Sequence, residues 1–358
     1  MRFLFIVQGE GRGHMTQALS MRDILVRNGH EVAEVLVGKS KVREIPSFFY
    51  EKIKADVHTY ESPNFQVSHN NKGIHVYRSI IFNITRLGVY MKSISFIRQK
   101  IKEHNPDAVI NFYEMLAGIT WFLYRPKVRY ICVGHQFLLL HPNFVFPKGQ
   151  RLQIWMLNFL TGLTSFKAEK RLALSFVPMP DIPKKKLFVV PPILRKEVLD
   201  LTPGNGGYLL GYMLNAGYGE EITRWHKNHP ELEAHFFWDK KDAPDELEVQ
   251  PKLFFHRISD VKFLKYMKDC MAFSSTSGFE SVCEAMYLRK PVLMVPTAGH
   301  IEQRCNSVDA VRAGAGITSD SFELDKLLEF IPHYDKNDQS FINWVHQGET
   351  KFIEFLTK

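Results

Sequence analysis

The chain alternates short, wholly apolar runs with stretches whose apolar residues recur at helical spacing. The first run, Phe3 to Val7, precedes a Gly-rich turn and a helical pattern over 16–27 that ends at Asn28-Gly29. A second apolar run covers 31–37. Runs that are apolar on both faces suit the central strands of a parallel sheet, joined by right-handed helical crossovers. The opening therefore predicts a strand–helix–strand unit.

The same alternation continues along the chain and predicts an α/β fold. Further strands are expected at 108–112, 128–133, 172–177, 187–190, 208–214, 234–238, 253–256, 271–274 and 291–295. Helices are expected at 80–103, 115–124, 151–171, 220–228, 260–268, 279–288, 301–313, 322–330 and 339–355. The segment 178–206 is rich in Pro and Lys and is typical of an interdomain linker. We expect an N-terminal domain over 1–195 and a C-terminal domain over 205–338, with the helix at about 339–358 a candidate to pack back on the first.

Composition excludes several classes of protein. Of 358 residues, 45% are hydrophobic and 23% charged, which excludes a disordered chain, a collagen and a small disulfide scaffold. The net charge of +8 and pI of 9.1 fit an anionic membrane surface or a phosphate-bearing substrate. The basic residues are dispersed and follow no aromatic–basic motif, so nucleic acid is disfavoured as a partner. No window reaches about 18 consecutive apolar residues, so no transmembrane helix is expected.

The cysteines indicate a compartment. The four cysteines show neither zinc-ligand spacing nor a disulfide framework: Cys132, Cys270, Cys283 and Cys305. They are typical of small buried residues in a reducing environment. We therefore expect a cytoplasmic protein, either free or peripheral at the inner membrane face.

The first motif lies between the first strand and the first helix. It reads Gly9-Glu10-Gly11-Arg12-Gly13-His14 and places free backbone N–H groups at a helix N-terminus. Such a turn favours an anion or the close approach of a ligand. A dinucleotide fingerprint would need a third Gly where His14 stands and an acid after the second strand, so NAD or FAD is disfavoured. A tight turn that serves only packing, with His14 as a structural residue, is the other alternative.

The second motif is richer and lies in the second half of the chain. A strand leads into Ser275-Thr276-Ser277-Gly278, a turn that opens a helix carrying Glu280 and Glu284. Unpaired N–H groups at 277–280 would favour a phosphate. The next strand ends at Pro296, and Glu302-Gln303 open a further helix at the same sheet edge, where they could bond sugar hydroxyls.

Together these motifs resemble the donor-binding half of GT-B glycosyltransferases of families 1 and 28. The matching residues are Ser277-Gly278, Glu284, Lys290-Pro291, Pro296, Glu302-Gln303, Asn306 and Gly314-Ala315-Gly316, with Gly11-Arg12-Gly13-His14 matching the N-terminal loop. The resemblance implies a GT-B fold, in which two Rossmann-like parallel-sheet domains face each other across a cleft. It also implies transfer of a hexosyl or N-acetylhexosaminyl group from a nucleotide sugar to a hydroxyl acceptor. UDP is the expected nucleotide, with GDP and dTDP open.

The resemblance also assigns roles to individual residues. Backbone groups of Ser277, Gly278, Phe279 and Glu280 would bind the donor diphosphate, and Glu284 the ribose. The remaining donor contacts would be Glu302 and Gln303 to the sugar, and Arg257 and Ile258 to the nucleotide base. A second Gly-rich loop is represented here only by Asn215 and Gly217. The Glu280 carboxylate would repel a diphosphate unless it turns away or binds a sugar hydroxyl.

The expected chemistry is an inverting displacement without a bound metal or cofactor. Retaining relatives carry a second Glu where Thr276 stands, which favours inversion here. His14 is then the candidate base or an acceptor-side contact, with Glu114 as the acid that orients it and His135 as an alternative base. Glu114 and His135 could equally be structural. No Asp-x-Asp motif follows a strand, so no divalent ion is expected.

The acceptor side offers weaker signals. The stretch 137–171 combines an apolar run and an amphipathic helix, with Lys184-Lys185-Lys186 soon after. It could be an interfacial patch for a lipid-linked acceptor, with a glycan as the other acceptor class, or a core helix with a solvated basic end. The loop 58–77 is a candidate acceptor-side flap. The competing functions are a nucleotide-sugar epimerase or hydrolase of the same fold, and a non-catalytic nucleotide-sugar-binding protein.

Overall fold

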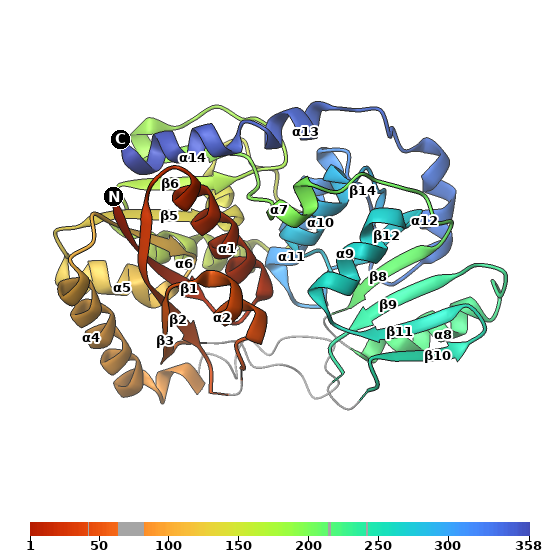
Figure 1. Cartoon of the computed structure of the whole chain (residues 1–358), viewed down its shortest axis with the longest axis horizontal. Helices are drawn as coiled ribbons and strands as arrows, with labels where there is room; N and C mark the ends of the chain where they lie inside the picture. Colours follow the sequence, from red (N-terminus) through yellow and green to blue (C-terminus); the bar gives the residue numbers. More distant parts are fainter. Residues whose placement is uncertain (42, 64–81, 214–215, 241–242) are drawn as a thin grey trace.

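The structure contains two seven-stranded sheets that lie side by side (Figure 1). It is a computed structural model that describes residues 1–41, 43–63, 82–213, 216–240 and 243–358. The first sheet is parallel throughout, and the second is parallel except for one edge strand. The α/β prediction with two parallel sheets is therefore confirmed.

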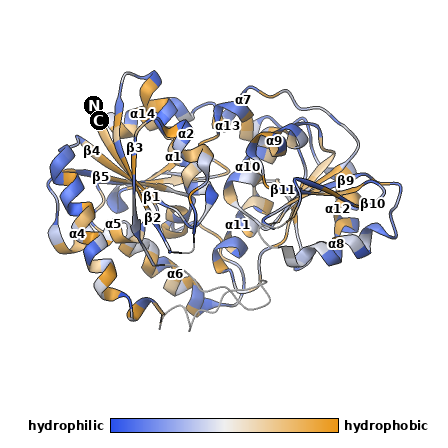
Figure 2. Ribbon diagram, turned by 60° about the horizontal axis from the view of Figure 1, so that its bottom comes forward, coloured by the Kyte–Doolittle hydropathy of each residue, from blue (hydrophilic) through white to orange (hydrophobic). Residues whose placement is uncertain are grey.

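The first sheet has the strand order β3-β2-β1-β4-β5-β6-β7. Its strands are β1 (Arg2–Gln8), β2 (Glu31–Lys39), β3 (Asp56–Glu61), β4 (Ala108–Phe112), β5 (Arg129–Gly134), β6 (Lys170–Leu174) and β7 (Leu187–Val190). The helices that contact it or each other are α1 (Arg12–Arg27), α2 (Ser47–Ile53), α4 (Leu87–His104), α5 (Met115–Tyr124) and α6 (Arg151–Thr164). Helices α1 and α2 cover one face, and α4, α5 and α6 form a layer on the other (Figure 2).

The alternation of side chains along β1 explains these two layers. Phe3, Phe5 and Val7 join the core beneath α1, whereas Leu4 and Ile6 join the core beneath α4 and α5. All five side chains are fully buried. A strand that is buried on both faces needs an apolar residue at every position, as this sequence provides.

The second sheet has the order β10-β11-β9-β8-β12-β13-β14, and β10 pairs antiparallel with β11. Its strands are β8 (Leu209–Met213), β9 (Ala234–Trp238), β10 (Glu246–Gln250), β11 (Leu253–Arg257), β12 (Ala272–Ser275), β13 (Val292–Met294) and β14 (Gly316–Thr318). The main helices that follow them are α8 (Gly219–His226), α9 (Asp260–Asp269), α10 (Phe279–Tyr287), α11 (Ile301–Arg312) and α12 (Leu324–Phe330). The short α7 (Lys196–Leu199) lies in the connection between the sheets.

Two features join the halves of the molecule. Phe279, at the start of α10, packs its ring 4.7 Å from that of Phe176 and 4.0 Å from that of His135, both of which belong to the first half. The chain then returns through α13 (Ser340–Val345) and α14 (Gly348–Thr357) to the first sheet, where α14 contacts β7 and α1. Trp344 anchors this return by donating from its indole N–H to the carbonyl of Ser175 at 2.9 Å.

Several sequence predictions need correction. The helix expected over 151–171 ends at Thr164, because the chain turns at Lys167, whose φ is +59°, and β6 begins at Lys170. The run Phe137–Leu140 belongs to a 3-10 helix (His135–Leu140) whose residues from 135 to 139 are buried. Short elements that the pattern missed are α2, β3, β10 and β14. In the expected flap over 58–77, residues up to 61 belong to β3, and 64–77 lie outside the described residues.

Other sequence expectations concern thiols and membrane spans. The four cysteines are buried and carry free thiols. Within the described ranges, no helix combines the length and the apolar character that crossing a bilayer requires.

The contact between α5 and α6 yields a test of packing. A Cβ at Gly118 of α5 would collide with the backbone carbonyls of Leu163 and Thr164, which cannot move aside as a side chain could. Gly118→Ala should therefore lower the free energy of unfolding by about 1–3 kcal/mol. Gly162→Ala on α6, where a Cβ meets no atom within 4 Å, should instead raise it by about 0.5–1 kcal/mol. Denaturant titrations of both variants would measure this difference, and equal stability would contradict the packing.

Candidate active site

The three glycines after β1 have different surroundings. Gly9 is packed against the next strand: its N–H donates to the carbonyl of Gly38 at 2.7 Å, and a Cβ would lie 2.9 Å from that oxygen. Gly11, the N-cap of α1, has no atom of another described residue within 4 Å of a Cβ position. A Cβ at Gly13 would collide with the carboxylate of Glu280 from the other half of the chain. The loop thus leaves open space at Gly11 and closes against α10 at Gly13.

The Ser277 turn has the geometry of an anion site. It joins β12 to α10, and Ser277 takes a left-handed φ of +62° while fully buried. The Ser277 hydroxyl has no hydrogen-bond partner among the described residues, although the carbonyl of Ser277 accepts from the Asn306 amide at 3.3 Å. The N-cap, Gly278, offers no side chain to the first N–H groups of α10. A helix N-terminus without a side-chain cap, beside an unpartnered buried hydroxyl, favours a bound anion.

Glu280 crosses between the two halves of the molecule. The Gln17 amide of α1 donates to its carboxylate, which lies over the backbone of Gly13. Burial raises the pKa of Glu280 to about 7, and the nearby carboxylates of Glu284 and Glu302 raise it further, while the Gln17 hydrogen bond opposes them. The Glu280 side chain therefore turns toward α1, which is one of the two arrangements expected to avoid repulsion of a diphosphate.

His14 lies between two amides. Its Nδ1 is 3.4 Å from the Oε1 of Gln17, and its Nε2 is 3.3 Å from the Nε2 of Gln136. The Gln17 nitrogen is used by Glu280, so its oxygen faces His14 and accepts from Nδ1–H, which leaves Nε2 as the basic nitrogen. Burial lowers the pKa of His14, partly offset by the charge of Glu302. A neutral imidazole whose Nε2 carries no proton, and accepts only from the Gln136 amide, can take up a proton.

The side-chain amide of Gln136 links His14 to Glu302, which is predicted to bind the donor sugar. Gln136 also donates to Glu302 at 3.0 Å, so each amide beside His14 bonds a glutamate from the second half of the chain. The ring of Tyr113 stacks on His14, with centroids 5.8 Å apart. Neither Gln17 nor Gln136 was predicted from the sequence, although Gln17 lies about one helical turn after His14 and Gln136 directly follows His135.

The structure does not pair Glu114 with His14. Glu114 caps α5 by accepting from the Leu116 N–H at 3.1 Å, and it accepts from the Ser62 hydroxyl at 2.6 Å. It is buried, and this burial raises its pKa to about 7. The expected carboxylate–histidine pair is thus replaced by amides, and a catalytic role for Glu114 stays a prediction.

His135 lies in the packed contact between the two halves. Its Nδ1 donates to the carbonyl of Leu174 at 2.8 Å, and its ring stacks on Phe279. Its Nε2 is 3.7 Å from a carboxylate oxygen of Asp309, and burial lowers the pKa of His135 to about 4. Only 2% of the residue is exposed, so an acceptor would have to displace neighbours to reach it. Its role as an alternative base stays a prediction.

The remaining donor residues are spread around the Ser277 turn. Glu284 is buried and receives two hydrogen bonds from Arg195, at 2.6 and 3.0 Å. Gln303 accepts from the N–H of Thr297 at 2.7 Å, three residues after β13 ends at Met294. Arg195 was missed because it lies in the linker, 89 residues before its partner, and no local pattern marks it.

The next residues are those predicted to border the nucleotide base and to form the second Gly-rich loop. Arg257, at the end of β11, is half exposed and pairs with Asp245, and Ile258 follows it. Gly217 belongs to a short 3-10 helix before α8, whereas Asn215 lies outside the described residues. Among the described residues, no group of three His, Cys, Asp or Glu side chains could hold a metal ion.

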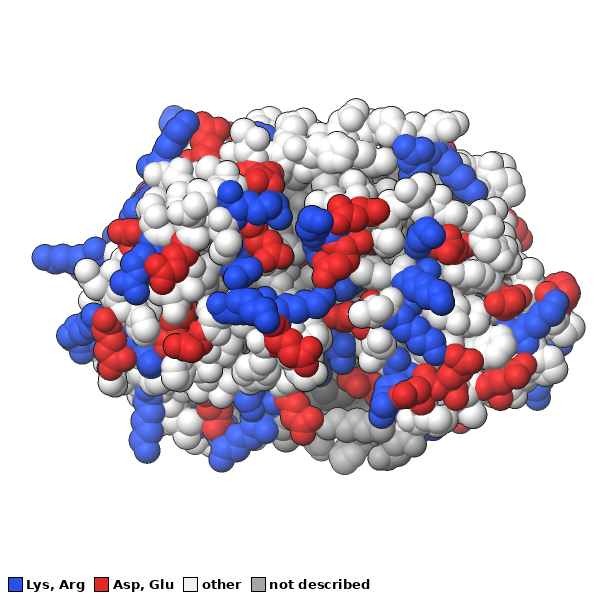
Figure 3. Space-filling view, viewed as in Figure 1, with Lys and Arg blue, Asp and Glu red and all other residues white. Residues whose placement is uncertain are grey.

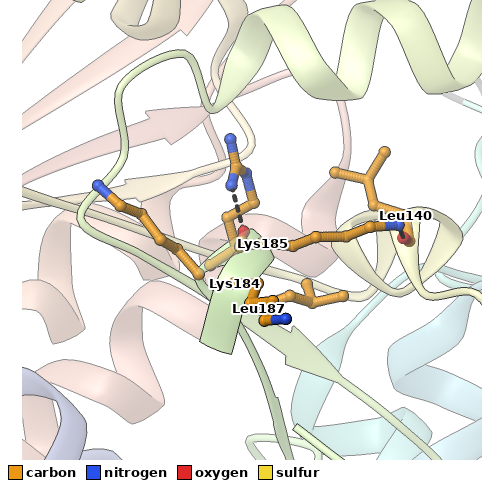
Figure 4. A pocket seen from close by; sticks show the side chains of 6 residues that line it. Leu140, Lys184, Lys185 and Leu187 are labelled. Atoms are coloured by element: carbon orange, nitrogen blue, oxygen red, sulfur yellow. Dashed lines mark hydrogen bonds between the residues drawn. The ribbon is translucent and has the colours of Figure 1, made fainter. Parts of the chain in front are cut away.

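A shallow pocket of about 370 Å³ lies elsewhere and contains none of the predicted site residues (Figure 4). It is lined by Leu140, Arg171, Lys184, Lys185, Lys186 and Leu187. Lys185 extends across it toward Leu140 and donates to that residue's carbonyl at 3.4 Å, whereas Lys184 points the other way.

Known proteins share this arrangement. The paired sheets, with the glycine loop of one meeting the Ser277 turn of the other, define a GT-B glycosyltransferase fold. The chain belongs to glycosyl transferase family 1, whose family model matches residues 1–333. The sequence prediction of a GT-B glycosyltransferase is thereby confirmed. A search of curated protein sequences gives no significant match.

Three solved structures illustrate the similarity. The glycotransferase of kitacinnamycin has a TM-score of 0.66 at 15% identity, with 99% of this chain and 98% of that chain covered. UGT2 of Phytolacca americana, complexed with UDP-2fluoro-glucose and pterostilbene, has a TM-score of 0.66 at 12% identity, with 99% and 98% covered. The UDP-GlcNAc 2-epimerase of Neisseria meningitidis, bound to UDP-GlcNAc, has a TM-score of 0.62 at 15% identity, with both chains covered completely.

The raised pKa of Glu280 predicts a pH-dependent effect on stability. Its ordinary value is 4.5, so the folded state favours the protonated form, and stability is lost as pH rises from about 4.5 through about 7. Glu280→Gln should therefore raise the melting temperature at pH 8 and leave it nearly unchanged at pH 5.

Glu349→Gln is the matched control. Hydrogen bonds from Arg27 and Asn28 lower the pKa of Glu349, so this variant should lose stability at pH 8. Melting curves of both variants at the two pH values provide the measurement. A Glu280→Gln effect that is equal at pH 5 and pH 8 would contradict the assignment.

Proposed function

We propose that the protein transfers a sugar from a nucleotide sugar to a hydroxyl acceptor, with the donor diphosphate at the N-terminus of α10. The observation that carries this proposal is the Ser277 turn, where a fully buried hydroxyl has no partner among the described residues and the helix N–H groups have no side-chain cap. A diphosphate would satisfy these donors, and the helix dipole would favour its charge. The open space at Gly11 gives a second backbone surface for the ligand.

The donor contacts follow from the residues around this turn. Glu302 lies beside His14 through Gln136 and is a suitable acceptor for hydroxyls of the donor sugar, with Gln303 next to it. Glu284 would hold the ribose, because a carboxylate offers about four acceptor positions and Arg195 occupies only part of them. Arg257 and Ile258 would border the base, which is uracil in the UDP-sugars of the Phytolacca and Neisseria structures.

The chemistry we propose is an inverting displacement. His14 Nε2 takes the proton from the acceptor hydroxyl as its oxygen bonds to the anomeric carbon, while the bond from that carbon to the diphosphate oxygen breaks. The N-terminus of α10 stabilises the negative charge that develops on the leaving diphosphate. Gln17 keeps the proton on Nδ1, so Nε2 is available as the base.

The acceptor is a hydroxyl-bearing molecule, either lipid-linked or a glycan. Two of the similar structures are complexed with pterostilbene or with quercetin, and these hydroxylated ligands support the proposal of a hydroxyl-bearing acceptor. A cytoplasmic location accords with the four buried free thiols.

A second candidate is epimerisation of a UDP-sugar. The Neisseria epimerase matches the complete chain, and Glu280 and Glu302 each bond an amide that contacts His14, so groups suited to acid–base chemistry on a sugar lie near one another. Incubation with UDP-GlcNAc alone, followed by proton NMR, distinguishes the two reactions. An epimerase produces the second UDP-sugar without any acceptor, whereas a transferase leaves the donor intact apart from slow hydrolysis.

Loss of the base should separate binding from transfer. His14→Ala removes the proton acceptor but none of the groups at the Ser277 turn, so transfer should fall by about 10²- to 10⁴-fold. Its affinity for UDP, measured by calorimetry, should change by less than about threefold. His333→Ala, an exposed position in the second half, is the control and should leave both quantities unchanged.

The activity assay uses a panel of UDP-, GDP- and dTDP-sugars with extracted lipids and glycans as acceptors. The anomeric configuration of the product, read by NMR, tests inversion. Full activity in His14→Ala would exclude His14 as the base. Absence of binding to every nucleotide would contradict the proposed donor site.

A further inference from the structure

The helix layer α4–α5–α6 carries an unusual share of exposed apolar side chains. Of the nineteen large apolar residues that are exposed in the described part of the chain, eleven lie between residues 82 and 159. They are Phe82, Ile84, Leu87, Met91, Phe122, Leu123, Tyr124, Val145, Leu152, Trp155 and Phe159. The helices touch one another in sequence order, α4 against α5 and α5 against α6 (Figure 2). Exposed apolar residues concentrated on one layer indicate an interaction surface.

The strongest part of this surface is one stripe on α6. Leu152, Trp155 and Phe159 are 75%, 64% and 57% exposed, and their spacing places them on the same side of the helix. The rings of Trp155 and Phe159 stack on each other, with centroids 5.8 Å apart. The opposite side of α6 holds the buried Thr161 and Thr164. The apolar stripe is thus a second apolar face, beyond the one that packs on the protein.

The net positive charge of the chain comes from the same region. Residues 82–171 contain thirteen Lys and Arg against four Asp and Glu, a net charge of +9, whereas the whole chain has +8. The rest of the chain is therefore close to neutral, at −1. Basic residues are dispersed along the chain, as the sequence predicted, and the excess arises because acidic residues are sparse in this segment. In the second half, acidic side chains gather along the β10 side of the sheet (Figure 3).

Basic groups directly adjoin the exposed rings. Lys148 and Arg151 are exposed at the start of α6, next to Leu152. The Arg98 guanidinium of α4 lies 4.4 Å from the ring centre of Tyr124 at the end of α5. Beyond the end of α6, the exposed lysines of the basic pocket continue the positive surface, since Arg171 of that pocket bonds Ser165 (Figure 4).

We propose that the α4–α5–α6 layer docks on a bilayer that contains anionic lipids, with the α6 stripe inserted at the headgroup level. Trp, Phe and Leu beside Lys and Arg form the composition that binds this interface, through apolar burial and attraction to anionic headgroups. Helix α6 begins at the carboxyl edge of the first sheet, the edge that carries the glycine loop. Docking would therefore hold the candidate active site close to the bilayer. This surface goes beyond the proposed transfer reaction and does not depend on it.

Vesicle co-sedimentation tests the proposal without donor or acceptor. The full chain should bind vesicles of phosphatidylcholine with 30–50% phosphatidylglycerol, and bind vesicles of phosphatidylcholine alone at least about tenfold more weakly. About 0.5 M salt should weaken the binding. The double variant Trp155→Ser/Phe159→Ser should lose at least about tenfold in partitioning, because it removes the two exposed rings.

Controls separate this surface from general stickiness and from misfolding. Val261→Ser removes a 78% exposed residue from α9 in the second half and should bind vesicles like the unmodified chain. Trp155→Phe should retain binding, and melting temperatures should be equal for all these variants because the side chains are exposed. If the serine variant unfolds, Lys148→Glu/Arg151→Glu tests the charge component instead.

Other outcomes would overturn the proposal. Equal binding to both vesicle types, or unchanged binding by the serine and charge-reversal variants, would exclude this surface. So would a concentration-dependent dimer that the serine variant abolishes, or tight binding to RNA with none to vesicles. Donor binding and transfer to a water-soluble acceptor are measured separately, so their failure would affect only the proposed function.

Discussion

The contact between Gly13 and Glu280 joins the two halves at the point where the chemistry is proposed. Two helix N-termini, those of α1 and α10, approach each other there, and neither has a side-chain cap, so both favour negative charge. The Glu280 carboxylate belongs to the first turn of α10 but lies over the start of α1. A Cβ at residue 13 would collide with the Glu280 carboxylate where it now lies, so a larger residue there would displace that side chain. The Glu280 carboxylate bonds Gln17 of α1 and its own backbone N–H, whereas the Ser277 hydroxyl before α10 has no partner among the described residues.

This contact also determines the state of His14. A histidine base is usually oriented by a carboxylate, whose charge raises the pKa of the imidazole. Here two neutral amides, Gln17 and Gln136, hold the ring, and burial lowers its pKa instead. The carboxylates of Glu280 and Glu302, from the second half, bond these two amides instead of the imidazole. The orientation of His14 therefore depends on the two halves being together, because separation would leave both amides free to rotate.

Sequence pattern predicted the elements whose signal is local. The strands at Phe3–Val7 and Ala108–Phe112 are wholly apolar, and the turn at Ser277 opens a helix where Ser and Gly precede it. Side-chain contacts between different elements could not be predicted in the same way. Glu114 follows β4, a strand beside β1, as expected. Its carboxylate caps its own helix instead of reaching His14, because the Leu116 N–H lies only two residues away along the chain. Arg195 pairs across 89 residues, and no spacing rule reveals such a partner.

Sequence pattern also could not predict which apolar residues after β5 are buried and which are exposed. Phe137–Leu139 and the α6 stripe are equally apolar in sequence, yet the first is buried against β6 and the second faces outward. Helical periodicity distinguishes one face of α6 from the other, but only the packing of α5 shows which face the protein already covers. Covering Trp155 and Phe159 from outside therefore requires a partner, and the +9 charge of residues 82–171 makes that partner negative. Because the second half carries no such excess, only the half that holds His14 would be drawn to an anionic surface.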